Sequence, residues 1–80
     1  MEFENFVKKL NCHYEKDSKG RINFYFMGIL FSIKAPKENH KGYIKYKNRN
    51  ISDTFFKSEI KDFNSFENKF NKIAKITKIA

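Results

Sequence analysis

Apolar and polar side chains alternate from Arg21 to Ile33, and the pattern returns between Gly42 and Lys47. A period of two is typical of a β-strand that buries one face and exposes the other to water. The buried face predicted in this way consists of Ile22, Phe24, Phe26, Ile29, Phe31, Ile33, Ile44 and Tyr46. The opposite face is predicted to carry Arg21, Asn23, Tyr25, Leu30, Ser32, Lys34, Tyr43, Lys45 and Lys47.

The alternation changes phase at Met27-Gly28. A shift by one position indicates either a β-bulge or a tight hairpin turn. We favour the hairpin because the two halves have equal length and each remains amphipathic. Gly28 would supply the positive φ that such a turn needs.

Two other segments repeat with the period of a helix. The first is residues 2–11, with Asn11 as the expected terminator and an apolar stripe formed by Phe3, Phe6, Val7 and Leu10. The second is residues 65–79, whose stripe is Phe66, Phe70, Ile73, Ala74 and Thr77. Asn64 and Glu67 have the spacing of a capping box, so we expect Asn64 to cap this helix.

The remaining segments complete a single domain over residues 1–80. Further strands are expected at 12–15, 43–47 and 52–60, and 35–42 is expected to be a long loop. In the last strand the residues predicted to point inward are Thr54, Phe56, Ser58 and Ile60. The predicted class is α+β, a two-layer sandwich. In it an antiparallel meander of four strands, within a range of three to five, packs one face against an N-terminal and a C-terminal helix.

The chain is strongly basic, with 17 Lys and Arg residues against 9 Asp and Glu residues and a net charge of +8. Such a charge favours a polyanionic partner, most often nucleic acid. However, Lys outnumbers Arg by 15 to 2, and Lys, Asn, Ile, Phe and Tyr all have AT-rich codons. A low-GC genome would therefore account for part of the charge, and the planar Arg side chain that best recognises phosphate is scarce.

The single cysteine, Cys12, excludes an internal disulfide and fits a reducing compartment. Because the start of the chain does not have the pattern of a signal peptide and the longest apolar run is short, we expect a soluble, cytoplasmic protein without a membrane partner. Cys12, His13 and His40 lack metal-ligand spacing, so neither a metal nor another cofactor is expected. An RNase toxin that uses His40 as its base, with Glu38 to orient it, is a distant alternative to a protein without enzymatic activity.

The predicted partner-binding surface combines the free sheet face with the basic loop and strand that follow it. Its residues are Tyr25, Leu30, Lys34, Lys37, Lys41, Tyr43, Lys45, Lys47 and Arg49. Phe55 is predicted to lie on the same side and would add to an aromatic patch framed by lysines. Patches of this kind are common at protein interfaces, while tyrosines and lysines together also suit single-stranded nucleic acid.

These features favour a non-enzymatic binding protein of the kind carried by phages and mobile elements. Its expected partner is a host protein or ribonucleoprotein that processes nucleic acid, which it would inhibit by occupying its surface, as anti-CRISPR proteins do. Direct binding of DNA or RNA by the same face is the alternative. The α–β–β–β–α order resembles that of double-stranded-RNA-binding domains and HicA-like RNase toxins. The chain lacks the basic, alanine-rich helix start of the former and the Gly-Ser-His signature of the latter, so no residue roles are transferred.

Overall fold

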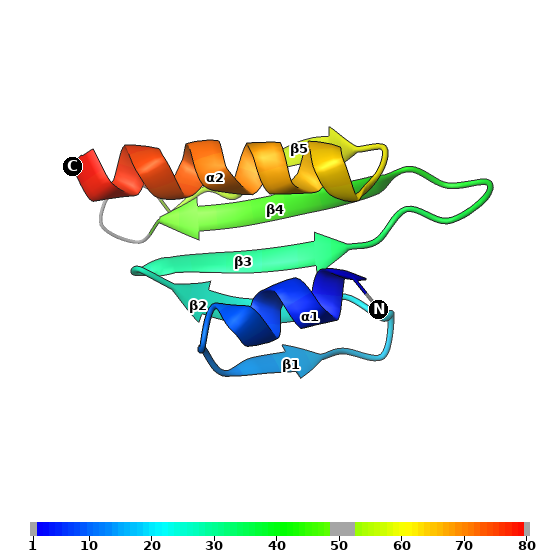
Figure 1. Ribbon diagram of the computed structural model, residues 1–80, viewed down its shortest axis with the longest axis horizontal. Helices are drawn as coiled ribbons and strands as arrows, with labels where there is room; N and C mark the ends of the chain where they lie inside the picture. Colours follow the sequence, from blue (N-terminus) through cyan, green and yellow to red (C-terminus); the bar gives the residue numbers. More distant parts are fainter. Residues whose placement is uncertain (1, 49–52, 80) are drawn as a thin grey trace.

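Five antiparallel strands follow one another in chain order across a single sheet, and both helices lie on the same face of it (Figure 1). The computed structural model describes residues 2–48 and 53–79, and side chains as far as residue 75. The elements are α1 (Glu2–Lys9), β1 (Tyr14–Lys16), β2 (Ile22–Phe26), β3 (Ile29–Lys34), β4 (Gly42–Asn48), β5 (Phe56–Ile60) and α2 (Phe63–Ile79). This arrangement confirms the predicted α+β meander.

The hairpin predicted at Met27-Gly28 joins β2 to β3. Phe26 pairs directly with Ile29, which leaves a loop of two residues. Both have positive φ, 54° at Met27 and 79° at Gly28. Positive φ at both positions is typical of a type I′ turn, whose twist matches that of the flanking strands. The phase change in the sequence is therefore a turn rather than a bulge.

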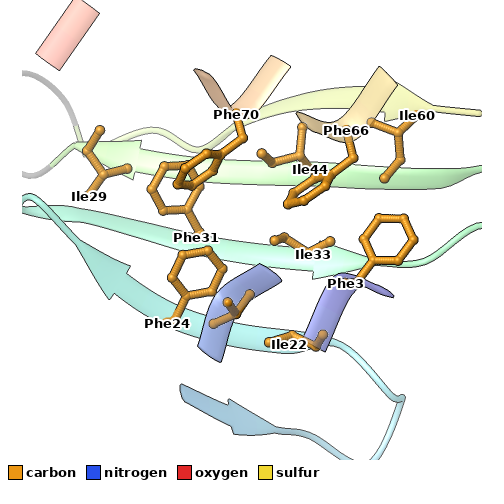
Figure 2. Packing of buried hydrophobic residues seen from close by; sticks show 11 residues of the cluster. Phe3, Ile22, Phe24, Ile29, Phe31, Ile33, Ile44, Ile60, Phe66 and Phe70 are labelled. Atoms are coloured by element: carbon orange, nitrogen blue, oxygen red, sulfur yellow. The ribbon is translucent and has the colours of Figure 1, made fainter. Parts of the chain in front are cut away.

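The face covered by the helices, called the inner face below, holds the hydrophobic core (Figure 2). Its buried residues are Phe3, Val7, Ile22, Phe24, Ile29, Phe31, Ile33, Ile44, Ile60, Phe66 and Phe70. Phe26 and Tyr46, also predicted to be buried, are partly buried and pack against this cluster. The alternation of the strands and the stripes of both helices thus converge on one core, as predicted.

Phe70 of α2 is at the centre of the aromatic packing. Its ring centroid lies 4.9 Å from that of Phe31 and 6.2 Å from that of Phe24, both in the sheet. The ring of Phe6 in α1 is 5.2 Å away, in an edge-on arrangement. Phe70 therefore contacts both the sheet and the other helix, and it buries a large apolar surface in doing so.

The last strand begins later than predicted. β5 starts at Phe56, so Thr54 precedes it, and residues 51 and 52 lie outside the described part of the chain. The predicted alternation holds from Phe56, which pairs with Tyr46 and stacks on its ring at 5.5 Å. Phe56 is nevertheless 50% exposed, whereas Ile60 at the other end of the strand is fully buried.

The predicted cap of the C-terminal helix is wrong. Asp62, not Asn64, is the cap, because its side-chain oxygen accepts a hydrogen bond from the backbone N–H of Ser65 at 2.8 Å. The Ser65 hydroxyl in turn accepts from the backbone N–H of Asp62 at 3.1 Å, which closes a reciprocal capping box. The helix starts earlier than predicted because the ring of Phe63 packs against that of Phe3, with centroids 5.4 Å apart, and this packing places Phe63 in the first turn.

Replacing Asp62 with alanine tests the corrected cap. We expect Asp62→Ala to lower the free energy of unfolding by about 1 kcal/mol, because the N–H of Ser65 loses its acceptor. Asn64→Ala is the matched control and should change it by less than about 0.5 kcal/mol. Urea denaturation of both variants provides the measurement. A larger loss for Asn64→Ala than for Asp62→Ala would restore the cap predicted from the sequence.

Replacing Phe70 with alanine tests the central packing. We expect Phe70→Ala to lower the free energy of unfolding by about 3–5 kcal/mol, because a large cavity opens between the helices and the sheet. The free energy of unfolding of a small domain is only about 5–15 kcal/mol, so this loss is a large fraction of the total stability. Phe55→Ala, on the opposite side of the sheet, should cost less than about 1 kcal/mol. Equal thermal shifts for the two variants would contradict this account of the core.

Candidate partner-binding surface

The face of the sheet opposite the helices, called the outer face below, presents its side chains in rows set by the strand register. The row nearest the Met27-Gly28 turn contains Tyr25, Leu30 and Lys47. The middle row contains Glu15, Asn23, Ser32, Lys45 and Lys57. The row at the other end contains Lys34, Tyr43 and Glu59.

Lysine ammonium groups lie over two of the aromatic rings of the outer face, those of Phe55 and Tyr43. The ammonium nitrogens of Lys45 and Lys47 lie 4.6 and 5.5 Å from the ring centroid of Phe55, which immediately precedes β5. Lys57 lies in the same way over Tyr43, at 4.5 Å. These are cation–π distances, and the lysine stems shield the rings from water. The rings thereby hold the three charges over β4 and β5.

A shallow hollow of about 300 Å³ lies at the centre of the outer face. Leu30 and Phe55 supply its apolar lining, and the buried Ser32 is also part of it. Polar groups from the β1–β2 side and from Lys45 complete the rim. A second hollow of about 200 Å³ adjoins it and shares Asn23 and Leu30. The outer face therefore combines an apolar centre with a polar surround that contains both basic and acidic side chains.

Asp17 organises the turn between β1 and β2 at one side of this surface. One carboxylate oxygen accepts hydrogen bonds from the backbone N–H groups of Lys19 and Arg21 at 2.9 and 3.0 Å. The other accepts from the Arg21 guanidinium at 2.6 Å and from the Asn23 amide at 3.3 Å. Partial desolvation raises the pKa of Asp17, but these hydrogen bonds outweigh it, so the pKa lies well below its usual range.

Cations near the edges of the outer face have acidic partners. Hydrogen bonding to the Tyr43 side chain, and then to Asp17, raises the pKa of Arg21. Lys41 and Glu59 form an exposed ion pair at 3.5 Å. By contrast, no acidic side chain among the described residues lies within ion-pair distance of Lys45, Lys47 or Lys57. Three lysines without an acidic partner among the described residues therefore lie at neighbouring positions of β4 and β5.

The structure groups some of the predicted surface residues and separates others. Those that share the outer face are Tyr25, Leu30, Lys34, Tyr43, Lys45 and Lys47. Lys37 and Lys41 instead belong to the segment between β3 and β4, which projects beyond the sheet in Figure 1. There Lys37 and His40 exchange backbone hydrogen bonds of 2.8 and 3.1 Å, forming a small hairpin of their own. Arg49 lies outside the described residues.

Two parts of the surface were not included in the prediction. Lys57 faces outward beside Lys45, and the alternation of 52–60 already contains this signal, because Phe56, Ser58 and Ile60 were assigned inward. The hydrogen bonds around Asp17 were also missed. They depend on how the turn of residues 17–21 closes, which composition alone does not specify.

The residues considered for catalysis or metal binding are dispersed. No group of three His, Cys, Asp or Glu side chains that would suit a metal ion occurs in residues 2–48 and 53–75. His40 is exposed in the small hairpin. On the outer side of β1, Nε2 of His13 lies 3.6 Å from Oε1 of Glu15. Burial raises the pKa of the Cys12 thiol, which disfavours the thiolate form that a nucleophile needs.

Comparisons with known proteins add no functional information. No protein-family model, curated protein or solved structure matches the chain. Within the described residues, neither helix has the length and apolar character required to cross a bilayer. The geometry and charge of the outer face are therefore the basis for any proposal about function.

Acid titration tests the role assigned to Asp17. Because folding lowers its pKa below the unfolded value of about 3.9, its stabilisation is present above about pH 4 and is lost as the pH falls further. The free energy of unfolding of the wild type should therefore fall more steeply below pH 4 than that of Asp17→Asn. Urea denaturation at a series of pH values provides the measurement. Parallel pH profiles for the two proteins would show that folding does not lower the pKa of Asp17.

Proposed function

We propose that the protein acts by binding, and that its outer face docks on the surface of a partner protein. The observation that supports this most strongly is the hollow lined by Leu30 and Phe55 with lysines around it. Protein interfaces commonly combine an apolar, aromatic centre with a polar rim. Phe55 remains 38% exposed, so part of its surface is available to a partner.

The lysines over Phe55 and Tyr43 favour a protein partner over a single-stranded nucleic acid, although Tyr25 on the same face is 50% exposed. Bases bind such proteins by stacking on open aromatic faces. Here the ammonium groups of Lys45 and Lys47 lie over Phe55, and that of Lys57 lies over Tyr43. A base would have to displace these lysines, whereas an apolar side chain entering the hollow would not.

The role we propose is stoichiometric inhibition of a host nucleic-acid enzyme, as in the small inhibitors of phages and mobile elements that include anti-CRISPR proteins. A small single domain with one face used for its core and one face left for contact suits such a role. The net charge of +8 favours an acidic target surface in the cytoplasm and disfavours mimicry of DNA.

Direct nucleic-acid binding is the second candidate, and the uncompensated lysines on β4 and β5 support it. Salt separates the two possibilities. Binding through phosphates should weaken steeply between about 50 and 200 mM salt, because each contact releases counterions. A mobility shift of DNA or RNA by the purified protein at low salt, abolished by Lys45→Gln, would favour this alternative.

Affinity capture tests the protein–protein proposal. The tagged protein should retain a defined partner from a lysate of the organism that carries its gene, both with and without nuclease treatment. Adding the protein in equimolar amount should inhibit that partner's activity on nucleic acid. Capture should fall at least about tenfold in Phe55→Ala, because an anchor residue of an interface is lost.

Phe56→Ala is the matched control, because Phe56 is the neighbouring aromatic residue, is half exposed, and lies on the inner side of the sheet. It should leave capture unchanged. If capture depends on intact nucleic acid, or is equally strong with Phe55→Ala, the outer face is not a protein-docking surface.

A further inference from the structure

Two lysines occupy directly opposed positions on the outer face. Lys45 of β4 and Lys57 of β5 are cross-strand partners, and Lys47 follows Lys45 at the next outward position of β4. Like charges at directly opposed positions destabilise a sheet. Because no acidic side chain among the described residues pairs with any of the three, this repulsion is not relieved within the fold.

Other lysines of the described residues, such as Lys8, Lys9 and Lys72, also lack an acidic partner, but none of these three faces another lysine directly across the sheet. Two other cations do have acidic partners. The ammonium of Lys16 lies 3.1 Å from the carboxylate of Glu4, and the guanidinium of Arg21 lies 2.6 Å from that of Asp17. An unfavourable local arrangement, such as two directly opposed lysines, is most often found at functional sites, where a ligand supplies the missing opposite charge. We call Lys45, Lys47 and Lys57 the lysine triad.

The aromatic rings keep the triad in place despite the repulsion. Lys57 leans over Tyr43, while Lys45 leans over Phe55 together with Lys47. The opposed lysines therefore contact different rings. Since the ammonium groups are already held, an anion that binds among them loses less free energy to the ordering of side chains.

We propose that the lysine triad binds carboxylates of an extended acidic segment of the partner protein, and that an apolar side chain of this segment enters the hollow beside Phe55. This inference rests on the proposed function and specifies its partner. Charge complementarity identifies the segment as acidic, and the apolar lining of the hollow requires one apolar residue. Outward residues two apart on a strand are about 6.6–6.8 Å apart, so alternate acidic residues of an extended chain match Lys45 and Lys47.

A peptide titration tests this inference without the natural partner. The probe is a short peptide of glutamates with one central leucine, blocked at both ends, added to the labelled full chain and followed by NMR. We expect shifts centred on the triad and Phe55. The peptide should bind at least about tenfold more weakly to the variant K45Q/K47Q/K57Q. The control K8Q/K9Q/K72Q removes the same charge from exposed helix positions and should bind within about twofold of the wild type.

A second variant separates binding from folding. Lys57→Glu converts the like-charge pair into an opposite-charge pair, so the urea midpoint should rise while peptide binding weakens. A lower midpoint, or unchanged peptide binding by either triad variant, would overturn the inference. Tighter binding of a short oligothymidylate than of the peptide at the same residues would also overturn it, in favour of nucleic acid. If the peptide does not bind, but affinity capture of a partner still requires Phe55, the inference is wrong and the proposed function stands.

Discussion

The packing of Phe70 against Phe31 and Phe6 is the interaction on which the rest of the structure depends. It fixes α2 to the middle of the sheet and to α1 at the same time, with ring centroids 4.9 and 5.2 Å apart. Both helices are consequently committed to the inner face. No other helix or strand of the described residues lies over the opposite face, whose side chains must be compatible with water while the strands remain a sheet.

The outer face meets this requirement with long basic side chains laid over aromatic rings. The ammonium groups of Lys45 and Lys57 lie over the rings of Phe55 and Tyr43. Asp17 pairs with Arg21 at the β1–β2 turn and Glu59 of β5 pairs with Lys41, but neither carboxylate lies within ion-pair distance of Lys45 or Lys57. The same arrangement that makes the face compatible with water therefore makes one part of it attractive to anions.

The sequence predicts those features that depend on local pattern. Alternation identified the core residues Phe31 and Ile33, and the phase change at Gly28 identified the hairpin. The cap at Asp62 was missed because it depends on the burial of Phe63 against α1, a tertiary contact. The outward orientation of Lys57 follows from the alternation of 52–60, but its position opposite Lys45 depends on the register of β5. Lys41 adjoins this surface through its ion pair with Glu59, whereas Lys37 belongs to the small hairpin that it forms with His40.

The outer face is a preformed surface, with three of its lysines held over aromatic rings. The chemical shifts of the lysine ε-methylene protons in the free protein report this arrangement, because protons over an aromatic ring are shifted upfield. A preformed surface predicts upfield shifts for Lys45, Lys47 and Lys57 relative to the exposed Lys8 of α1. Equal shifts for all these lysines would show that the three side chains move freely in water, and would contradict it.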